Sequence, residues 1–160
     1  MKAHCPDCGA PLGGRDGCDA AFHELGARAY ADAGFAYRRR AVVDAYALQH
    51  PAYILSLKSF AAHFCGLCAA VERTGDPYAH RATSSHLRIP PDAEKPLVPV
   101  GRAALTIAEV LRATSPTTFR PAVDIWIAEV WRAWSEHHEL ARTWLDYSVQ
   151  SLARGVHRRR

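Results

Sequence analysis

The segment AYILSLKSFAAHFCGLCAAVER, residues 52–73, carries apolar side chains on most faces of the helix that its spacing predicts. Apolar positions recur every three or four residues: Ile54, Leu57, Ala61, Phe64, Cys68 and Val71, with Phe60, His63 and Leu67 on a second flank. A helix that is apolar on most sides is buried by other elements. We therefore predict a buried helix here.

The segments that precede it also predict helices. DGCDAAFHELGARAYADAG offers Asp16 or Asp19 as an N-cap and Gly34 as a stop. YRRRAVVDAYALQHP predicts a second helix that ends at His50, because the α conformation is disfavoured for the residue before Pro51.

The C-terminal part predicts two more helices. A short helix is capped near Thr106, and a long one runs from Pro121 to about Arg154. The long helix has one continuous apolar seam: Val123, Ile127, Val130, Trp134, His138, Ala141, Leu145, Val149 and Leu152. No segment alternates with period two, so we predict an all-α fold. The expected architecture is a bundle of about five helices with an N-terminal knuckle-like loop.

The length of 160 residues fits one domain. We predict a single helical domain over 1–160, with a knuckle at 1–18, three helices over 19–73, a loop with one short helix over 74–101, C-terminal helices over 102–155 and a basic tail at 156–160.

The composition, 49% hydrophobic with a net charge of +4, is that of a folded protein. The basic clusters at 38–40 and 157–160 lack interleaved aromatic residues, so we expect a solubilising tail and no nucleic-acid partner. No apolar run approaches ~18 residues without a charge, which predicts no membrane span. The first residues lack the apolar stretch of a signal peptide. We expect a cytoplasmic protein, in which clustered cysteines bind metal rather than form disulfides.

The segment CPDCGAPLGGRDGC, residues 5–18, has the spacing of a zinc site. In Cys5-Pro-Asp-Cys8-Gly, two thiolates three residues apart on a tight turn can bind one ion. The glycine lets the backbone turn so that amides face the sulfurs. Cys18 follows at the predicted start of a helix, where the helix dipole favours a thiolate. The cofactor that we predict is Zn²⁺, bound by these three cysteines.

A structural zinc ion needs four ligands, and the sequence leaves the fourth open. Cys68, with Cys65, forms a second C-x-x-C inside the buried helix, although free cysteine also packs as a hydrophobe. His50 lies where a helix ends at a proline and can point sideways. His63 lies on the buried helix and needs a polar partner. His23 falls about 140° round the helix from Cys18 and points elsewhere. We favour His50, then His63.

Four strings in the chain resemble an uncharacterised family of small bacterial proteins. They are CPDCGA…GC near the start, VVDAYALQHP at 42–51, AAHFCGLC…E at 61–72 and VWRAWSEHHELARTW near the C-terminus. The most distinctive is D-A-Y-x-x-Q-H-P. The resemblance places Cys5, Cys8, Cys18, Asp44, Gln49, His50 and His63 at motif positions, and it leaves Cys65 out. It implies no established activity.

Four polar side chains, Asp44, His50, His63 and His138, fall on helix faces that we expect to be at least half buried. Helical bundles often build metal or catalytic sites from such groups on facing helices. We expect His138 to meet a polar partner from the second or third helix, with the other three as candidates. Alternatively, Asp44 pairs with Arg40 four residues back, and each histidine is a hydrogen-bonded core residue.

Two functions follow from these patterns. The first is a zinc-binding helical protein whose metal is mainly structural, with a ligand pocket lined by histidines and a small molecule or a protein as its partner. The alternative is a metal-dependent enzyme of the hydrolase or lyase type, with Asp44, His63 and His138 as catalytic residues beside His50. Four protein ligands around the metal favour the first, and three ligands plus water favour the second.

Overall fold

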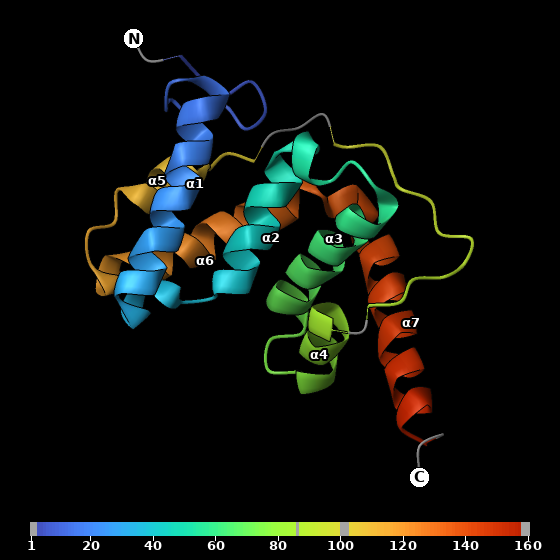
Figure 1. Cartoon of the computed structure of the whole chain (residues 1–160). Helices are drawn as coiled ribbons and strands as arrows, with labels where there is room; N and C mark the ends of the chain where they lie inside the picture. Colours follow the sequence, from blue (N-terminus) through green and yellow to red (C-terminus); the bar gives the residue numbers. More distant parts are fainter. Residues whose placement is uncertain (1–2, 86, 100–102, 158–160) are drawn as a thin grey trace.

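The computed structural model describes residues 3–85, 87–99 and 103–157, which form seven α-helices and no strand. The helices are α1 Gly14–Ala31, α2 Arg39–Gln49, α3 Leu57–Glu72, α4 Pro77–Ser85, α5 Ile107–Leu111, α6 Pro116–Ala133 and α7 His138–His157 (Figure 1). Three 3₁₀ turns are η1 Ala33–Ala36, η2 Pro51–Tyr53 and η3 Ser135–His137. The all-α prediction is confirmed. The predicted count of about five helices was too low for two reasons. Helix α4 is an additional helix in the region predicted as a loop, and the long C-terminal helix that we predicted is two helices, α6 and α7.

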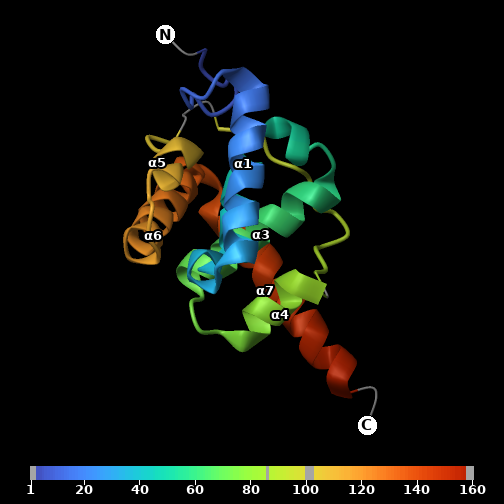
Figure 2. The same cartoon turned by 60° about the vertical axis from the view of Figure 1, so that its left-hand side comes forward.

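Helix α3 is the centre of the packing. It contacts α2, α4, α6 and α7, and Figure 1 shows it between α2 and α7. Helix α1 packs instead on α5 and η1, and the view in Figure 2 brings α1 forward beside α5 and α6. The burial predicted for the helix over 52–73 is confirmed, although the helix begins later, at Leu57. Its central position is a finding of the structure.

Aromatic side chains fill the interface between α3 and the C-terminal helices. Phe60 and Phe64 stack with ring centroids 4.8 Å apart, and both rings lie 5.5 Å from the ring of Trp134. Trp144 meets both phenylalanines edge-on, at 6.0 and 6.2 Å. Large, fully buried rings of this kind contribute much of the apolar area that folding removes from water.

The helix predicted from Pro121 to Arg154 was wrong in both its start and its continuity. Helix α6 begins at Pro116, where Ser115 is the N-cap in a capping box, and Pro121 lies inside it. Trp134 ends α6, and η3 separates it from α7. The three-and-four spacing runs through this break because a 3₁₀ turn advances about three residues per turn. The break lets α6 and α7 each pack on α3.

The N-cap predicted for the first helix was also wrong. Helix α1 begins at Gly14 with Gly13 as its N-cap, and it ends before Asp32. Gly13 and Gly14 have φ of 91° and 88°, a backbone conformation that favours glycine. Both amides donate to the carbonyl oxygen of Ala3, at 2.8 and 3.1 Å, so the knuckle itself sets the helix start. The cap predicted near Thr106 is confirmed, in a capping box with Glu109.

Within the described part of the chain, no helix combines the length and the apolar character that crossing a bilayer requires.

Candidate metal centre

The knuckle is a tight turn that places two cysteine side chains on the same side. The Gly9 amide donates to the Cys5 carbonyl at 2.9 Å, and the Cys5 amide donates to the Ala10 carbonyl at 2.8 Å. Gly9 has a φ of 85°, as the turn requires. The backbone of Ala10 also hydrogen-bonds the Cys8 sulfur. The turn therefore holds Cys5 and Cys8 together before any ion is bound.

Two helices bring the other two residues of the centre. Cys18 lies in the second turn of α1, near the end where the helix dipole favours a thiolate. Arg15 in the same helix donates to both carboxylate oxygens of Asp7, at 2.6 and 2.8 Å, which fastens the knuckle to α1. His50 is the C-cap of α2, with an extended backbone at φ −127° before Pro51. The proline thus turns the imidazole out of the helix and toward the knuckle.

The four ligand atoms are close enough to hold a single ion. The sulfurs of Cys5, Cys8 and Cys18 and a ring nitrogen of His50 all lie within 4.8 Å of one another. His50 Nε2 is 3.7 Å from the Cys5 sulfur and 3.3 Å from the Cys18 sulfur, and the Cys8 and Cys18 sulfurs are 3.6 Å apart. Around a tetrahedral zinc ion, with bonds of about 2.3 Å to sulfur and 2.0 Å to nitrogen, ligand atoms lie roughly 3.5–3.8 Å apart. The cluster has the size of that shell.

The orientation of His50 is set by its second ring nitrogen. Nδ1 lies 2.6 Å from the carbonyl oxygen of Tyr46, one helical turn back. A carbonyl only accepts, so Nδ1 carries a proton and Nε2 is the ring atom that faces the sulfurs, to which it presents its lone pair whenever the ring is neutral. A metal-ligating histidine usually donates its other N–H to such an acceptor. The Tyr46 ring also stacks on His50 at 4.0 Å, and Phe22 of α1 stacks on Tyr46 at 4.1 Å.

The sulfurs of Cys8 and Cys18 lie within hydrogen-bond distance of each other, at 3.6 Å. Their hydrogen bond lowers the pKa of Cys8 to about 4 and raises the pKa of Cys18. Three neighbouring thiols in one buried cluster therefore resist full ionisation when no cation is bound. A bound dication would supply positive charge to the thiolates, and its binding would be coupled to proton release.

The buried carboxylate of Asp44 forms a separate polar contact between α2 and α3. Asp44 accepts hydrogen bonds from Arg40 Nε at 2.9 and 3.0 Å and from His63 Nδ1 at 2.9 Å. Burial raises the pKa of Asp44, while His63 and the Arg40 charge oppose that shift. Gly66 of α3 gives the carboxylate room, because a Cβ there would lie 2.3 Å from Asp44 Oδ2. Asp44 pairs with Arg40, and His63 is hydrogen-bonded to Asp44. This arrangement matches the alternative given above, in which these residues have a structural role rather than a catalytic one.

Gln49, another residue of the D-A-Y-x-x-Q-H-P string, joins α2 to the C-terminal half. Its amide nitrogen donates to the Leu105 carbonyl at 2.9 Å, and its oxygen accepts from Trp126 Nε1 at 3.0 Å. Each polar residue of this string therefore has a partner on another element or lies at the metal centre.

His138 does not meet the partners that we predicted for it. Its Nε2 lies 2.8 Å from the Trp131 carbonyl oxygen, and its ring stacks on the Trp131 ring at 4.0 Å. The nearest carboxylate is Glu72 of α3, at 3.8 Å from Nδ1. A partner from the third helix was expected, but Asp44, His50 and His63 were the wrong candidates, because His138 begins α7 beyond the break after α6. Glu72 is occupied by Arg142, which donates to it at 2.6 and 2.9 Å.

The remaining cysteines and His63 lie outside the metal cluster. Cys65 and Cys68 are fully buried in α3, where burial raises both thiol pKa values, that of Cys68 to about 12. They pack as apolar residues. Among the three candidates for the fourth ligand, His50 is the one that the structure places beside the three cysteines.

Two cavities in the described part of the chain bear on the pocket that we predicted to be lined by histidines. A cavity of about 70 Å³ lies beside Cys8 and Gln49, and a larger one of about 430 Å³ lies between α1 and α2. His50, His63 and His138 line neither of these two. The catalytic role of Asp44, His63 and His138 stays a prediction, and the structure does not gather the three into one site.

Sequence reasoning missed Tyr46 and Phe22, which hold His50 in place. The signal was available in part, because Tyr46 precedes His50 by four residues on a helix, the spacing at which side chains meet. The stacking of Phe22 on Tyr46 joins α1 to α2. No pattern of residues within either helix predicts this contact.

The fold and the site together define a class: an all-helical protein with a buried three-cysteine, one-histidine cluster that could hold a metal ion. More specifically, the chain belongs to the family described as "Family of unknown function (DUF5946)", which residues 3–135 match. The resemblance to a family without an established activity is thereby confirmed. No curated protein and no solved structure matches the chain.

Proposed function

We propose that the chain is a zinc protein in which a closed, structural Cys₃His centre fastens the N-terminal knuckle to α1 and α2. The observation that carries this proposal is the convergence of four buried ligand atoms from three separate segments within 4.8 Å. The ligand set is Cys5, Cys8, Cys18 and His50.

The chemistry of the donor set favours zinc. Thiolates are soft ligands that select zinc, copper(I) or iron–sulfur clusters, and imidazole is a common zinc ligand. Three of the six pairs of ligand atoms are 3.3–3.7 Å apart and all lie within 4.8 Å, which leaves room for one ion and not for a cluster with bridging sulfides. Cys₃His tetrahedra are an established form of structural zinc site.

The closed shell supports a structural role over the alternative of a metal-dependent hydrolase or lyase. All four ligands come from the protein, and their exposed fractions are 0% for Cys5 and Cys18, 4% for Cys8 and 3% for His50. A catalytic zinc ion keeps a position open for water or substrate. Three thiolates also donate enough charge to make the zinc ion a weaker Lewis acid than a histidine-rich site would.

The energy of such a site is large compared with the stability of a domain. Structural zinc sites contribute apparent binding free energies of about 10–16 kcal/mol in zinc-finger peptides. Whole domains are stable by only about 5–15 kcal/mol. Removal of the ion is therefore expected to unfold the knuckle and the start of α1.

The test is metal content in matched histidine variants. Elemental analysis of the purified full chain should give about one zinc per chain. His50→Ala should weaken zinc binding by more than the ~10–100-fold that loss of an outer hydrogen-bond partner costs. His63→Ala, the control, should keep the zinc. Cobalt substitution should give the charge-transfer absorption of thiolate ligands.

Two results would contradict the proposal. One is a purified chain without metal, or with a Cys5–Cys8 disulfide under reducing conditions. The other is chelation that leaves the circular dichroism and the melting temperature unchanged while it abolishes an activity, which would indicate a catalytic ion.

A further inference from the structure

The larger cavity, of about 430 Å³, lies away from the metal ligands, between α1, η1, α2 and α6. Its lining is mainly apolar, with Phe22 and Leu25 from α1, Phe35 from η1, Val42 from α2 and Phe119 from α6. Small-molecule sites are typically apolar concavities of roughly 300–1,000 Å³ with a few polar groups that orient the ligand. The cavity has the size and the lining of such a site.

The walls of the cavity are held in place by contacts behind them. Phe22 stacks on Tyr46 at 4.1 Å, and Phe35 meets Phe119 edge-on at 5.2 Å. Asp32 caps η1 by accepting the Gly34 amide at 2.7 Å. A cavity whose rings are fixed in this way exists before the ligand arrives, so binding costs little ordering of the protein.

Gly26 keeps the α1 side of the cavity open. It lies in the interior of α1, and a Cβ built on it would meet nothing within 4 Å. Its φ is not positive, so neither backbone conformation nor close packing requires a glycine at this position. A glycine in a helix interior costs about 1 kcal/mol relative to alanine. The missing side chain leaves space on the face that Phe22 and Ala29 also present to the cavity.

The charged residue at the cavity is Arg39, the first residue of α2. Its neighbours are engaged, since Arg38 bonds Asp124 and the Ala70 carbonyl, and Arg40 bonds Asp44. Within the described ranges, Arg39 has no hydrogen-bond or ion-pair partner.

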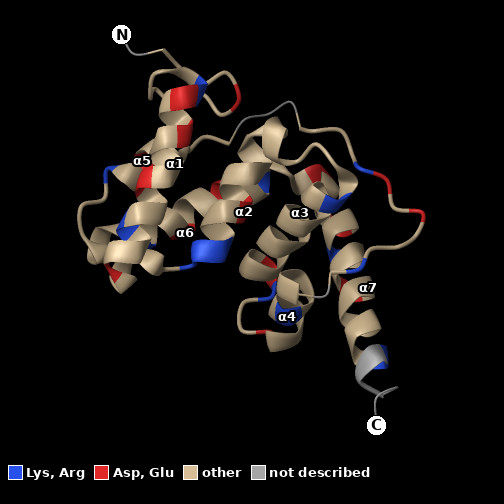
Figure 3. Cartoon of the chain, in the orientation of Figure 1, with Lys and Arg blue, Asp and Glu red and all other residues tan. Residues whose placement is uncertain are grey.

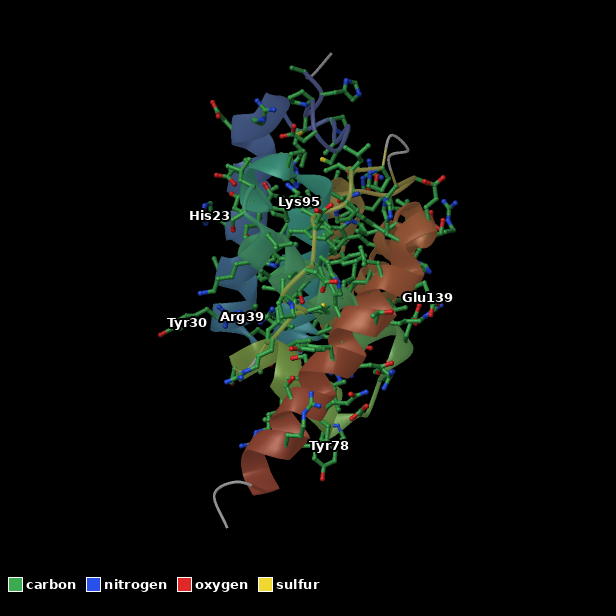
Figure 4. All side chains as sticks on the ribbon, turned by 90° about the vertical axis from the view of Figure 1, so that its right-hand side faces the viewer. His23, Tyr30, Arg39, Tyr78, Lys95 and Glu139 are labelled. Carbon is green, nitrogen blue, oxygen red and sulfur yellow. The ribbon has the colours of Figure 1, made fainter. Side chains whose placement is uncertain are left out.

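Two further features favour an anion near Arg39. The positive end of the α2 dipole lies at the same place, and Figure 3 shows the basic residues gathered at this end of α2. Figure 4 labels Arg39 and His23 on the side of the molecule where α1 runs. His23, the other polar lining residue, lies 3.9 Å from Asp19 and so already has a carboxylate neighbour.

We propose that this cavity binds a small carboxylic acid with an apolar body, whose chain or ring lies among the phenylalanines and whose carboxylate pairs with Arg39. Charge complementarity selects this occupant. A neutral apolar molecule would form no ion pair with Arg39, and the guanidinium would repel a protonated amine. The proposal does not depend on the identity of the metal.

The experiment is an NMR titration of the ¹⁵N-labelled full chain, as purified, with octanoate, octanol and octylamine. Octanoate should bind saturably and shift amides of α1, η1 and the start of α2, with the Gly26 amide as a direct reporter. Octanol should bind more weakly, and octylamine should not bind.

Four variants test the site. Arg39→Gln should weaken octanoate binding ~3- to 5-fold, the range of an exposed ion pair, and leave octanol unchanged. Arg39→Lys should restore most of the affinity. Arg81→Gln on α4 removes the same charge at a distance and should have no effect. Gly26→Leu should block the cavity while the fold is kept, because leucine is the better helix former.

Several results would overturn the proposal: no saturable binding, equal affinity for octanoate and octanol, or octanoate binding that survives Gly26→Leu in a folded protein. Shifts over the same residues that depend on protein concentration alone would also overturn it, since they would show that a second copy of the chain covers this face.

Discussion

Gly66→Ala is expected to destabilise the protein, although the same change in a helix interior normally stabilises it by about 1 kcal/mol. The added Cβ would lie 2.3 Å from Asp44 Oδ2 and 2.9 Å from its Cγ. The carboxylate has no free direction in which to move, because Asp44 is fully buried and is held by Arg40 and His63. Either α2 and α3 separate, or the hydrogen bonds to Asp44 lengthen.

The magnitude follows from three contributions. Overpacking of a core costs about 1–3 kcal/mol. Loss of a charge-assisted hydrogen bond costs about 1.5–3 kcal/mol, and the gain in helix propensity returns about 1 kcal/mol. The net loss in the free energy of unfolding is then about 1.5–5 kcal/mol, which for a domain of this size lowers the melting temperature by roughly 3–20 °C.

The matched control is Gly26→Ala, the same substitution in α1, where the Cβ meets nothing within 4 Å. It should stabilise by about 0.5–1 kcal/mol. Urea unfolding followed by circular dichroism measures both variants. In the Asp44→Ala background, Gly66→Ala should lose most of its cost, because the clash is removed. A Gly66→Ala variant as stable as Gly26→Ala, or a cost unchanged without Asp44, would refute the reasoning.

Three other predictions concern single contacts. Gln49→Ala should cost about 1–3 kcal/mol in urea unfolding, because it leaves the indole N–H of the buried Trp126 without its partner, and a loss below 0.5 kcal/mol would contradict this. Thiol titration at pH 8 should find all five cysteines unreactive in the metal-loaded protein, with three reacting after chelation and Cys65 and Cys68 only after unfolding, since burial raises the pKa of both. Early reaction of Cys68 would show that α3 opens locally. His138→Ala should lower stability by about 1–2 kcal/mol, through its bond to Trp131, while the zinc content stays the same, and loss of zinc would show a connection that the structure does not contain.

The spacing of residues along the chain was enough to predict the features that depend on a single helix or a single turn. The apolar pattern of 52–73 predicted burial correctly, because a helix that is apolar on most sides has no stable position at the surface. Thr106 was recognisable as a cap because its partner, Glu109, lies within the same turn. His50 was favoured as the fourth ligand because Pro51 ends the helix there and frees the histidine to point sideways.

Features that depend on where two helices meet were not predictable in the same way. The break after α6 lies within an unbroken three-and-four pattern, and only the packing of Trp134 on Phe60 and Phe64 reveals it. His138 lies beyond that break, so its hydrogen-bond partner is the Trp131 carbonyl rather than a side chain of the second or third helix.

The sequence by itself determined the class of fold and the three cysteines of the knuckle, because helical periodicity and C-x-x-C spacing act over a few residues. The sequence ranked His50 above His63 as the fourth ligand, and the tertiary structure decided between them. Only the tertiary structure shows that Asp44 bonds His63 of α3 and that a cavity lies between α1 and α2. The physical reason is distance along the chain. Cys18 and His50 are 32 residues apart, and their contact depends on how α1 and α2 pack around Phe22 and Tyr46.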